Sequence, residues 1–257
     1  MIDPRASVHQ EALLGPGVQV GPFSIIDAKV EIGEGTKIWP HVVIRGPTRI
    51  GRNNQIYSFC SIGEDPQDKK FEPGSNSRLE IGDRNTIREY VSINRGTPAG
   101  GGATRIGNDN WVMASCHVAH DCVLGDHVVL ANNATLAGHV VIEDHVTLGG
   151  FTGVHQFCRV GAYSFTGITS VIVKDVPPFI IAAGQTAKAY GLNRVGLKRH
   201  GFSSQDMDSL RAAYRTLYRE GLTLATALER LDQMAQDSAV VQQLAEFIKK
   251  SERGIVR

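Results

Sequence analysis

Histidine is concentrated in the middle of the chain. Six of the nine histidines lie between residues 117 and 155, and one of them, His120, is followed directly by Asp121. A histidine beside an aspartate can act as a general base, because the carboxylate orients the imidazole. Histidines are also common as metal ligands and as solvated surface residues. Which of the three roles applies depends on the neighbours that the surrounding secondary structure gives to each histidine.

A period of six residues runs through most of the chain. Ten consecutive aliphatic residues occur at steps of six from Val8 to Ile62, and the same spacing returns between Ile106 and Val160. Neither the helical period of 3.6 residues nor the two-residue alternation of a strand gives this spacing. A short strand and a tight turn repeated every six residues do, with glycine or asparagine supplying positive φ at the turns. The pattern therefore predicts a parallel β-helix.

Such hexapeptide repeats resemble the left-handed β-helix family, in which three hexapeptides form one triangular coil. Residues one coil apart then lie about 4.8 Å from each other, the usual spacing between strands. Residues 120 and 138 differ by 18, as do residues 121 and 139, so His120 should lie beside Gly138 and Asp121 beside His139. A base, its carboxylate and a backbone N–H that can hold an oxyanion suit acyl transfer. Zinc is less attractive, because the nearby ligands lack the short spacings of structural zinc sites.

The repeat is interrupted twice and then ends. The interruptions, 64–78 and 97–104, are polar and rich in proline or glycine, so we expect loops that carry function. Pro177 and Pro178 end the regular pattern. Ser203 and Thr223 are expected to cap two helices, and a third helix should follow around Val240. The sequence thus predicts a mainly β fold: a left-handed parallel β-helix over 1–190, then a small α-helical C-terminal domain over 191–257.

Composition excludes several classes of protein. The 27 Lys and Arg residues nearly balance the 26 Asp and Glu residues, so we expect no nucleic-acid partner. No signal peptide or long apolar run is present, which favours a cytoplasmic protein without integral membrane association. The four cysteines form no CxxC pair and are expected to be buried thiols: Cys60, Cys116, Cys122 and Cys158.

Four segments together resemble the UDP-N-acetylglucosamine O-acyltransferase family of lipid A biosynthesis, and the likeness covers essentially the whole chain. They are HVAHDCVLGDHVVLANNATLAGHV (117–140), GVHQFCRVGA (153–162), QDKKF (67–71) and LNRVGLKRHGFS (192–203). The resemblance implies a cytosolic homotrimer with active sites between neighbouring prisms. It also implies transfer of a (3R)-hydroxyacyl group from acyl carrier protein to the glucosamine 3-hydroxyl of UDP-N-acetylglucosamine. We expect neither a cofactor nor a metal.

The same resemblance implies roles for individual residues. His120 would be the general base, Asp121 would support it, and the Gly138 N–H would hold the oxyanion. The other implied roles concern substrate binding: His117, His139 and His155 line the cleft, Gln156 positions the nucleotide sugar, Asp68 and Lys70 contact sugar and phosphate, and Asn193 and Arg199 bind the nucleotide.

Two departures from the family's motifs concern the substrates. Asn94 stands where the family commonly has the histidine of IHRGT, and some members acylate a 3-amino analogue of the sugar, so an amide product is an alternative. Val195 stands where the family's NxEG has a glutamate, which removes a carboxylate expected near the uridine. Two other protein classes remain as alternatives: a prism that serves only for interaction, and a zinc-dependent carbonic-anhydrase-like hexapeptide protein.

Two further features concern the acyl donor. The resemblance makes Ile168 the ruler at which the acyl chain ends, and its branched side chain favours a short hydroxyacyl group, near ten carbons. Arg211, Arg215 and Arg219 recur every four residues and place three positive charges on one helix face. This face either docks the acidic acyl carrier protein or is a solvated basic surface.

Overall fold

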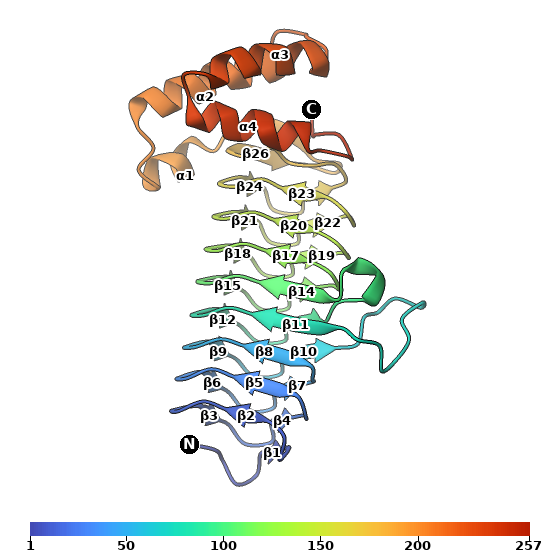
Figure 1. Ribbon diagram of the computed structural model, residues 1–257. Coiled ribbons are helices and arrows are strands. Elements are labelled where there is room, and N and C mark those ends of the chain that lie inside the picture. Colours follow the sequence, from blue (N-terminus) through green and yellow to red (C-terminus); the bar gives the residue numbers. More distant parts are fainter.

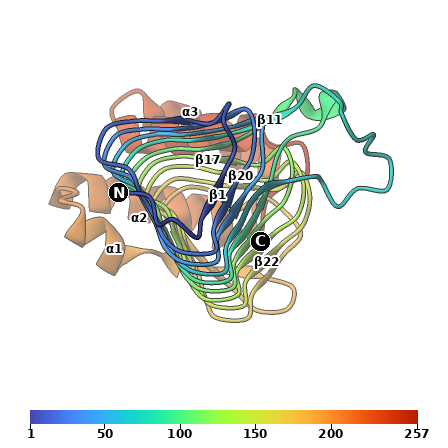
Figure 2. The ribbon, with the colours of Figure 1, turned by 90° about the horizontal axis from the view of Figure 1, so that it is seen from below.

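Three sheets, parallel except for one antiparallel strand at the end of the third, form the walls of a triangular prism in the computed structural model, which describes residues 1–257 (Figures 1 and 2). The nine-stranded sheet contains β1 (Ser7–Val8), β4 (Ile25–Ile26), β7 (Val43–Ile44), β10 (Ser61–Glu64), β13 (Ser92–Asn94), β16 (His117–Val118), β19 (Thr135–Leu136), β22 (Gly153–Val154) and β25 (Val171–Ile172). The eight-stranded sheet contains β2 (Leu13–Leu14), β5 (Val30–Ile32), β8 (Thr48–Ile50), β11 (Arg78–Ile81), β14 (Ala103–Ile106), β17 (Val123–Leu124), β20 (Val141–Ile142) and β23 (Arg159–Val160). The ten-stranded sheet contains β3 (Gln19–Val20), β6 (Lys37–Ile38), β9 (Gln55–Ile56), β12 (Thr86–Ile87), β15 (Trp111–Val112), β18 (Val129–Leu130), β21 (Thr147–Leu148), β24 (Phe165–Thr166), β26 (Ile180–Ala183) and β27 (Lys188–Leu192).

The strand register follows the hexapeptide repeat. Ser7 pairs with Ile25 and His117 with Thr135, each a step of 18 residues (25 − 7 and 135 − 117). The repeated aliphatic residues fill the prism as one core of 40 buried residues. The four cysteines are also buried, as predicted, and burial raises the pKa of Cys60 and of Cys122 to about 12. The left-handed parallel β-helix predicted from the sequence is confirmed.

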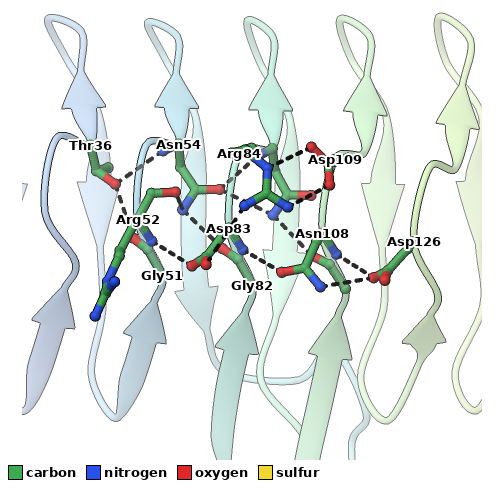
Figure 3. A network of polar contacts seen from close by, with 12 residues as sticks. Thr36, Gly51, Arg52, Asn54, Gly82, Asp83, Arg84, Asn108, Asp109 and Asp126 are labelled. Atoms are coloured by element: carbon green, nitrogen blue, oxygen red, sulfur yellow. Dashed lines mark hydrogen bonds and ion pairs between the residues drawn. The ribbon is translucent and has the colours of Figure 1, made fainter.

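Side chains bind neighbouring coils together at the corner between the eight- and ten-stranded sheets (Figure 3). The N–H of Arg52 donates to Oδ1 of Asp83 at 2.7 Å, and the N–H of Asp83 donates to Oδ1 of Asn108 at 2.8 Å. The N–H of Asn108 in turn donates to Oδ1 of Asp126 at 2.6 Å. Each turn N–H thus finds its acceptor on the next coil, which fixes the stacking of the coils.

Two loops leave the prism at the corner between the nine- and eight-stranded sheets, on adjacent coils (Figure 1). The first loop is 65–77, between β10 and β11, and the second is 95–102, between β13 and β14. The second contains the short 3-10 helix η1 (Pro98–Gly100). Both differ by one or two residues at each end from the predicted 64–78 and 97–104. β10 extends to Glu64 and β13 ends at Asn94, while β11 and β14 pair from Arg78 and Ala103 onward.

Helices cover the C-terminal end of the prism (Figure 1). They are α1 (Arg194–Arg199), α2 (Ser204–Tyr218), α3 (Leu224–Ala235) and α4 (Ala239–Lys249). Ser203 caps α2 in a capping box with Asp206, and Thr223 caps α3, as predicted. None of these helices has the length and apolar character needed to cross a bilayer. The sequence did not predict α1, or the antiparallel pairing of β27 with β26 that precedes it.

Candidate active site

Successive coils bring the predicted base and its neighbours together at the corner between the nine- and eight-stranded sheets, which we call the His120 corner. The N–H of His139 donates to the carbonyl of His120 at 3.0 Å. The N–H of Phe157 donates to the carbonyl of Gly138 at 3.2 Å on the following coil. The backbone therefore stacks His120 against Gly138 and Asp121 against His139, as the 18-residue spacing predicts.

His120 and Asp121 form a hydrogen-bonded pair. Nδ1 of His120 lies 2.8 Å from Oδ2 of Asp121, and the imidazole is 15% exposed while the carboxylate is fully buried. An ionised carboxylate can only accept a hydrogen bond, so Nδ1 must carry the proton. Nε2 of a neutral imidazole is then an unprotonated nitrogen, and it has no partner within the protein. His120 can therefore accept a proton from a bound molecule.

Thr97 from the second loop completes the surroundings of Asp121. Its N–H donates to Oδ1 at 2.8 Å, and its hydroxyl donates to Oδ2 at 2.7 Å. Burial alone would raise the pKa of Asp121, but the hydrogen bonds from His120 and Thr97 outweigh that effect and hold the pKa below its usual value. Asp121 therefore remains an anion at neutral pH and keeps the imidazole oriented.

Gly138 contributes its backbone. Gly138 is buried, and its N–H donates to no acceptor in the protein. A Cβ atom at this position would lie 2.6 Å from Cε1 and 2.8 Å from Nε2 of His120, so only glycine lets the ring lie this close. An unpaired N–H beside the free nitrogen of a base is suited to stabilise an oxyanion.

The same cluster contains three side chains that could bind a metal ion. His120, Asp121 and His139 each offer an atom, and these atoms lie within 4.8 Å of one another. Nε2 of His139 is 3.7 Å from Oδ2 of Asp121, too far for a hydrogen bond. Both carboxylate oxygens of Asp121 already accept hydrogen bonds from Thr97, so a metal would have to compete with them. This arrangement favours the base over the metal site.

The other predicted cleft residues lie along the same corner. Nδ1 of His117, in β16, is 2.7 Å from the hydroxyl of Ser92, and burial lowers the pKa of His117, which favours its neutral form. His155 and Gln156 are exposed one coil beyond Gly138. In the first loop, the N–H of Lys70 donates to Oδ1 of Asp68 at 3.0 Å, and both residues are exposed.

The predicted nucleotide residues lie at a different corner of the same chain. Asn193 caps α1 by accepting the N–H of Gly196, and its amide donates to the carbonyl of Tyr163 at 2.9 Å. Tyr163 lies at the corner between the eight- and ten-stranded sheets. Arg199 lines a groove of about 850 Å³ between α1 and α2, together with three further basic residues, Arg194, Lys198 and Arg211. A single chain therefore does not bring Asn193 and Arg199 to the His120 corner.

Ile168 lies at the third corner, between the ten- and nine-stranded sheets, and is 69% exposed. Its neighbour on the preceding coil is Gly150, which has no side chain to cover it.

Sequence reasoning missed Thr97 as a partner of Asp121. The two are 24 residues apart, whereas one coil has 18 residues, so the coil spacing could not pair them; the second loop supplies the additional residues.

Comparison with known families gives matches over both parts of the chain. A family described as "Udp N-acetylglucosamine O-acyltransferase; Domain 2" matches residues 175–256. The bacterial transferase hexapeptide repeat family matches residues 11–46 and 103–138. The acyl-[acyl-carrier-protein]–UDP-N-acetylglucosamine O-acyltransferase of Halorhodospira halophila is 56% identical, over 100% of this chain and 99% of its own. The enzyme of the same name from Thiobacillus denitrificans is 53% identical, over 98% of this chain and 100% of its own.

Solved structures agree with these matches. The UDP-N-acetylglucosamine acyltransferase of Francisella novicida superimposes with a TM-score of 0.98 at 40% identity, over 100% of this chain and 94% of that one. The UDP-N-acetylglucosamine O-acyltransferase of Moraxella catarrhalis gives a TM-score of 0.97 at 45% identity, over 100% and 99%. On its sequence, its fold and the identity of its relatives over full length, this chain belongs to the acyl-[acyl-carrier-protein]–UDP-N-acetylglucosamine O-acyltransferase family.

Proposed function

We propose that this protein transfers a (3R)-hydroxyacyl group from acyl carrier protein to the glucosamine 3-hydroxyl of UDP-N-acetylglucosamine, the first step of lipid A biosynthesis. One observation carries the proposal. His120 has Nδ1 bound to Asp121 at 2.8 Å and Nε2 free, next to the unpaired N–H of Gly138. A base and an oxyanion donor side by side are what the attack of a hydroxyl on a thioester requires.

The steps follow from these atoms. Nε2 of His120 takes the proton of the sugar 3-hydroxyl while the oxygen of that hydroxyl attacks the thioester carbon. As the new C–O bond forms, the carbonyl oxygen becomes an oxyanion that the Gly138 N–H stabilises. The C–S bond then breaks, and the imidazolium returns the proton to the departing thiolate of the carrier protein. Asp121 stays ionised throughout and stabilises the imidazolium.

The remaining predicted residues bind substrate in this proposal. His117, His139 and His155 line the cleft, and Gln156 positions the nucleotide sugar. Asp68 and Lys70 of the first loop contact sugar and phosphate, and Asn193 and Arg199 bind the nucleotide. An arginine and a lysine suit a pyrophosphate because both stay charged and donate several hydrogen bonds. The two domains, 1–190 and 191–257, would thus supply the acyl-transfer site and part of the nucleotide site.

We also propose that the protein is a cytoplasmic homotrimer. The separation of the His120 corner from α1 within one chain supports this, because a neighbouring prism can bring its own α1 to that corner. Exposed aromatic rings support association as well. Phe23, His41, Phe59 and Tyr90 stack in one column with centroids 5.1 to 5.2 Å apart. Phe23, Phe59 and Tyr90 are 49 to 61% exposed, which is unusual for a surface that stays in water.

The hydroxyl acceptor is favoured over the 3-amino analogue by the position of Asn94. Asn94 is 3% exposed, and its amide donates to the carbonyl of Asp65 at 2.9 Å. It therefore serves the backbone of the first loop and is poorly placed to select the acceptor atom. The carbonic-anhydrase-like and interaction-only alternatives are not favoured by the relatives from Halorhodospira halophila and Thiobacillus denitrificans, which are both named as O-acyltransferases.

The decisive experiment is mass spectrometry of the product. The protein is incubated with UDP-N-acetylglucosamine and a panel of (3R)-hydroxyacyl carrier proteins, and in parallel with the 3-amino analogue. We expect a nucleotide sugar heavier by one hydroxyacyl group and cleaved by mild alkali, as an ester is. An alkali-stable product formed only from the amino analogue would establish the amide alternative. No acylated sugar with any donor would contradict the proposal, and full activity after treatment with a chelator would contradict the zinc alternative.

A further inference from the structure

One short segment, residues 94–97, runs from the last residue of β13 into the second loop, and its side chains bind two different parts of the site. Thr97 holds Asp121 through two hydrogen bonds, from its N–H at 2.8 Å and from its hydroxyl at 2.7 Å. Thr97 is only 7% exposed, so water does not replace these bonds. The carboxylate is therefore fixed on one side by Thr97 and on the other by Nδ1 of His120.

Two glycines allow the segment to lie this close. A Cβ atom on Gly100 would collide with the carboxylate of Asp121, and one on Gly96 would collide with the backbone of Ala103. The N–H of Gly100 also donates to the hydroxyl oxygen of Thr97 at 3.0 Å. The Thr97 hydroxyl thus accepts from Gly100, so its own proton is directed to Asp121.

Arg95, two residues before Thr97, binds the first loop. It pairs with Asp65, and its guanidinium carbon lies 5.6 Å from the centroid of the Phe71 ring. Arg95 also donates to the carbonyls of Gly46 and Gly63 on the prism, each at 3.3 Å, and is 8% exposed. Asp65 and Phe71 stand on either side of Asp68 and Lys70, so Arg95 fixes the part of the loop that carries these two residues.

We infer that Thr97 and Arg95 are positioning residues for acyl transfer: Thr97 orients Asp121 and through it His120, and Arg95 holds the first loop against the prism for binding of the nucleotide sugar. The inference rests on the proposed function. Because the two residues act on different parts of the site, the kinetic consequences of their loss differ. Loss of the Thr97 hydroxyl lowers kcat, whereas loss of the hydrogen bonds from the Arg95 guanidinium group raises KM for the sugar.

The first test is Thr97→Val, which keeps the shape of the side chain and the backbone N–H but removes the hydroxyl. We expect kcat to fall about tenfold to a hundredfold, as for a lost hydrogen bond to a charged group, with KM for either substrate little changed. The pKa of Asp121 should rise, because one of the bonds that lower it is gone. Titration of the Asp121 carboxyl by carbon-13 NMR measures that shift without any turnover. Thr97→Ser should restore both values.

Thr147→Val is the matched control, because Thr147 lies in the ten-stranded sheet away from the His120 corner. It should leave kcat and the Asp121 titration unchanged. An unaltered Asp121 titration in Thr97→Val would overturn the role of Thr97 even if kcat fell. Failure of the wild-type protein to acylate the sugar would refute the proposed function, whereas the NMR result would still decide how Asp121 is held.

The second test is Arg95→Lys. Lysine keeps the positive charge but cannot donate several hydrogen bonds in one plane, as a guanidinium group does. We expect the dissociation constant for UDP-N-acetylglucosamine, measured by calorimetry, to rise about tenfold. KM for the acyl carrier protein and the Asp121 titration should not change. Arg105→Lys is the control, since Arg105 forms an exposed pair with Glu80. Thermal unfolding of each variant checks the fold, and a folded Arg95→Lys protein with wild-type sugar affinity would overturn the role of Arg95.

Discussion

Gly138 lies against the imidazole of His120 so closely that a Cβ atom on residue 138 would be 2.6 Å from Cε1 of the ring. The imidazole thus occupies the space that any side chain on residue 138 would need. The Gly138→Ala variant should therefore displace the imidazole from its place beside the reacting hydroxyl. We expect kcat to fall by about a hundredfold, the usual effect of misplacing catalytic groups. Steady-state kinetics measures it.

Gly191→Ala is the control for that experiment, because a Cβ atom on Gly191 meets no atom within 4 Å. It should leave kcat unchanged. If Gly138→Ala retained wild-type kcat, residue 138 would not constrain the base, and the proposed oxyanion donor would have to be sought elsewhere.

The role of His120 predicts a large effect on turnover and a moderate one on stability. His120→Ala should lower kcat by about 10²–10⁴-fold, as expected for the loss of a general base. The free energy of unfolding should fall by about 1–3 kcal/mol, because the imidazole is only 15% exposed and its loss takes one hydrogen bond from the buried Asp121 carboxylate. His9→Ala, on an exposed histidine in the first coil, is the control. A His120→Ala protein with most of its activity would exclude this residue as the base.

The lowered pKa of Asp121 predicts how stability depends on pH. A carboxyl whose pKa is lower in the folded than in the unfolded chain stabilises the fold above its unfolded pKa, near 3.8, and this contribution is lost as pH falls through the folded pKa. Asp121→Asn cannot titrate. Its free energy of unfolding should therefore fall less steeply than that of the wild type as pH drops below 3.8. Urea unfolding across this range measures both slopes, and equal slopes would mean that Asp121 is not held as an anion.

The six-residue period explains why much of this site could be predicted. Because β-helix coils have a fixed length, a step of 18 residues identifies spatial neighbours, and Asp121 does lie against His139 (139 − 121). The period carries no information once the chain leaves the prism. The contact of Thr97 with Asp121 depends on the path of the second loop, and Arg95 meets Asp65 across an insertion of irregular length.

The C-terminal part was predictable where capping residues mark helix ends. Ser203 and Thr223 each cap a helix through a side-chain hydrogen bond. α1 has six residues, too few for a periodic apolar face, and only Leu197 in it is buried. The chain reaches α1 through the antiparallel pair of β26 and β27 in the ten-stranded sheet, and this pair places α1 at a corner other than that of His120. The local residue pattern does not predict that pairing.

The basic face of α2 predicts a salt-dependent interaction with the donor. Arg215 is 73% exposed at its side chain and lies 3.3 Å from Glu220, while Arg211 pairs with Asp208. Exposed pairs of this kind contribute little to stability, so these arginines are available to an acidic partner. Arg215→Glu should raise KM for the acyl carrier protein and weaken its dependence on salt, with KM for the sugar unchanged.

Arg5→Glu makes the same charge change two residues before β1, the strand at the end of the prism opposite the helices (Figure 1), and serves as the control. If Arg215→Glu and Arg5→Glu gave the same KM for the carrier protein, the basic face of α2 would be a solvated surface without a role in docking.

Ile168 predicts the length of the acyl chain. Its side chain is 69% exposed at the corner between the ten- and nine-stranded sheets, and Gly150 leaves the surface beside it open. A branched side chain at Cβ has few rotamers and cannot easily swing aside, so it should stop a chain that runs along this corner.

Each methylene that would otherwise be buried is worth about 0.8 kcal/mol, or about fourfold in kcat/KM. The donor near fourteen carbons should therefore lose about two orders of magnitude in kcat/KM relative to a groove that buries its last four methylenes. The steric cost of forcing those methylenes past Ile168 makes wild type prefer the donor near ten carbons. Ile168→Gly should shift the preference toward the longer donor while kcat with its best donor stays close to wild type. Competition between the two hydroxyacyl carrier proteins, read by product mass, measures the ratio. Leu13→Gly, which removes an equally exposed aliphatic side chain from the first coil, should leave the ratio unchanged. A wild-type protein that used both donors equally well would mean that the chain ends elsewhere than at Ile168.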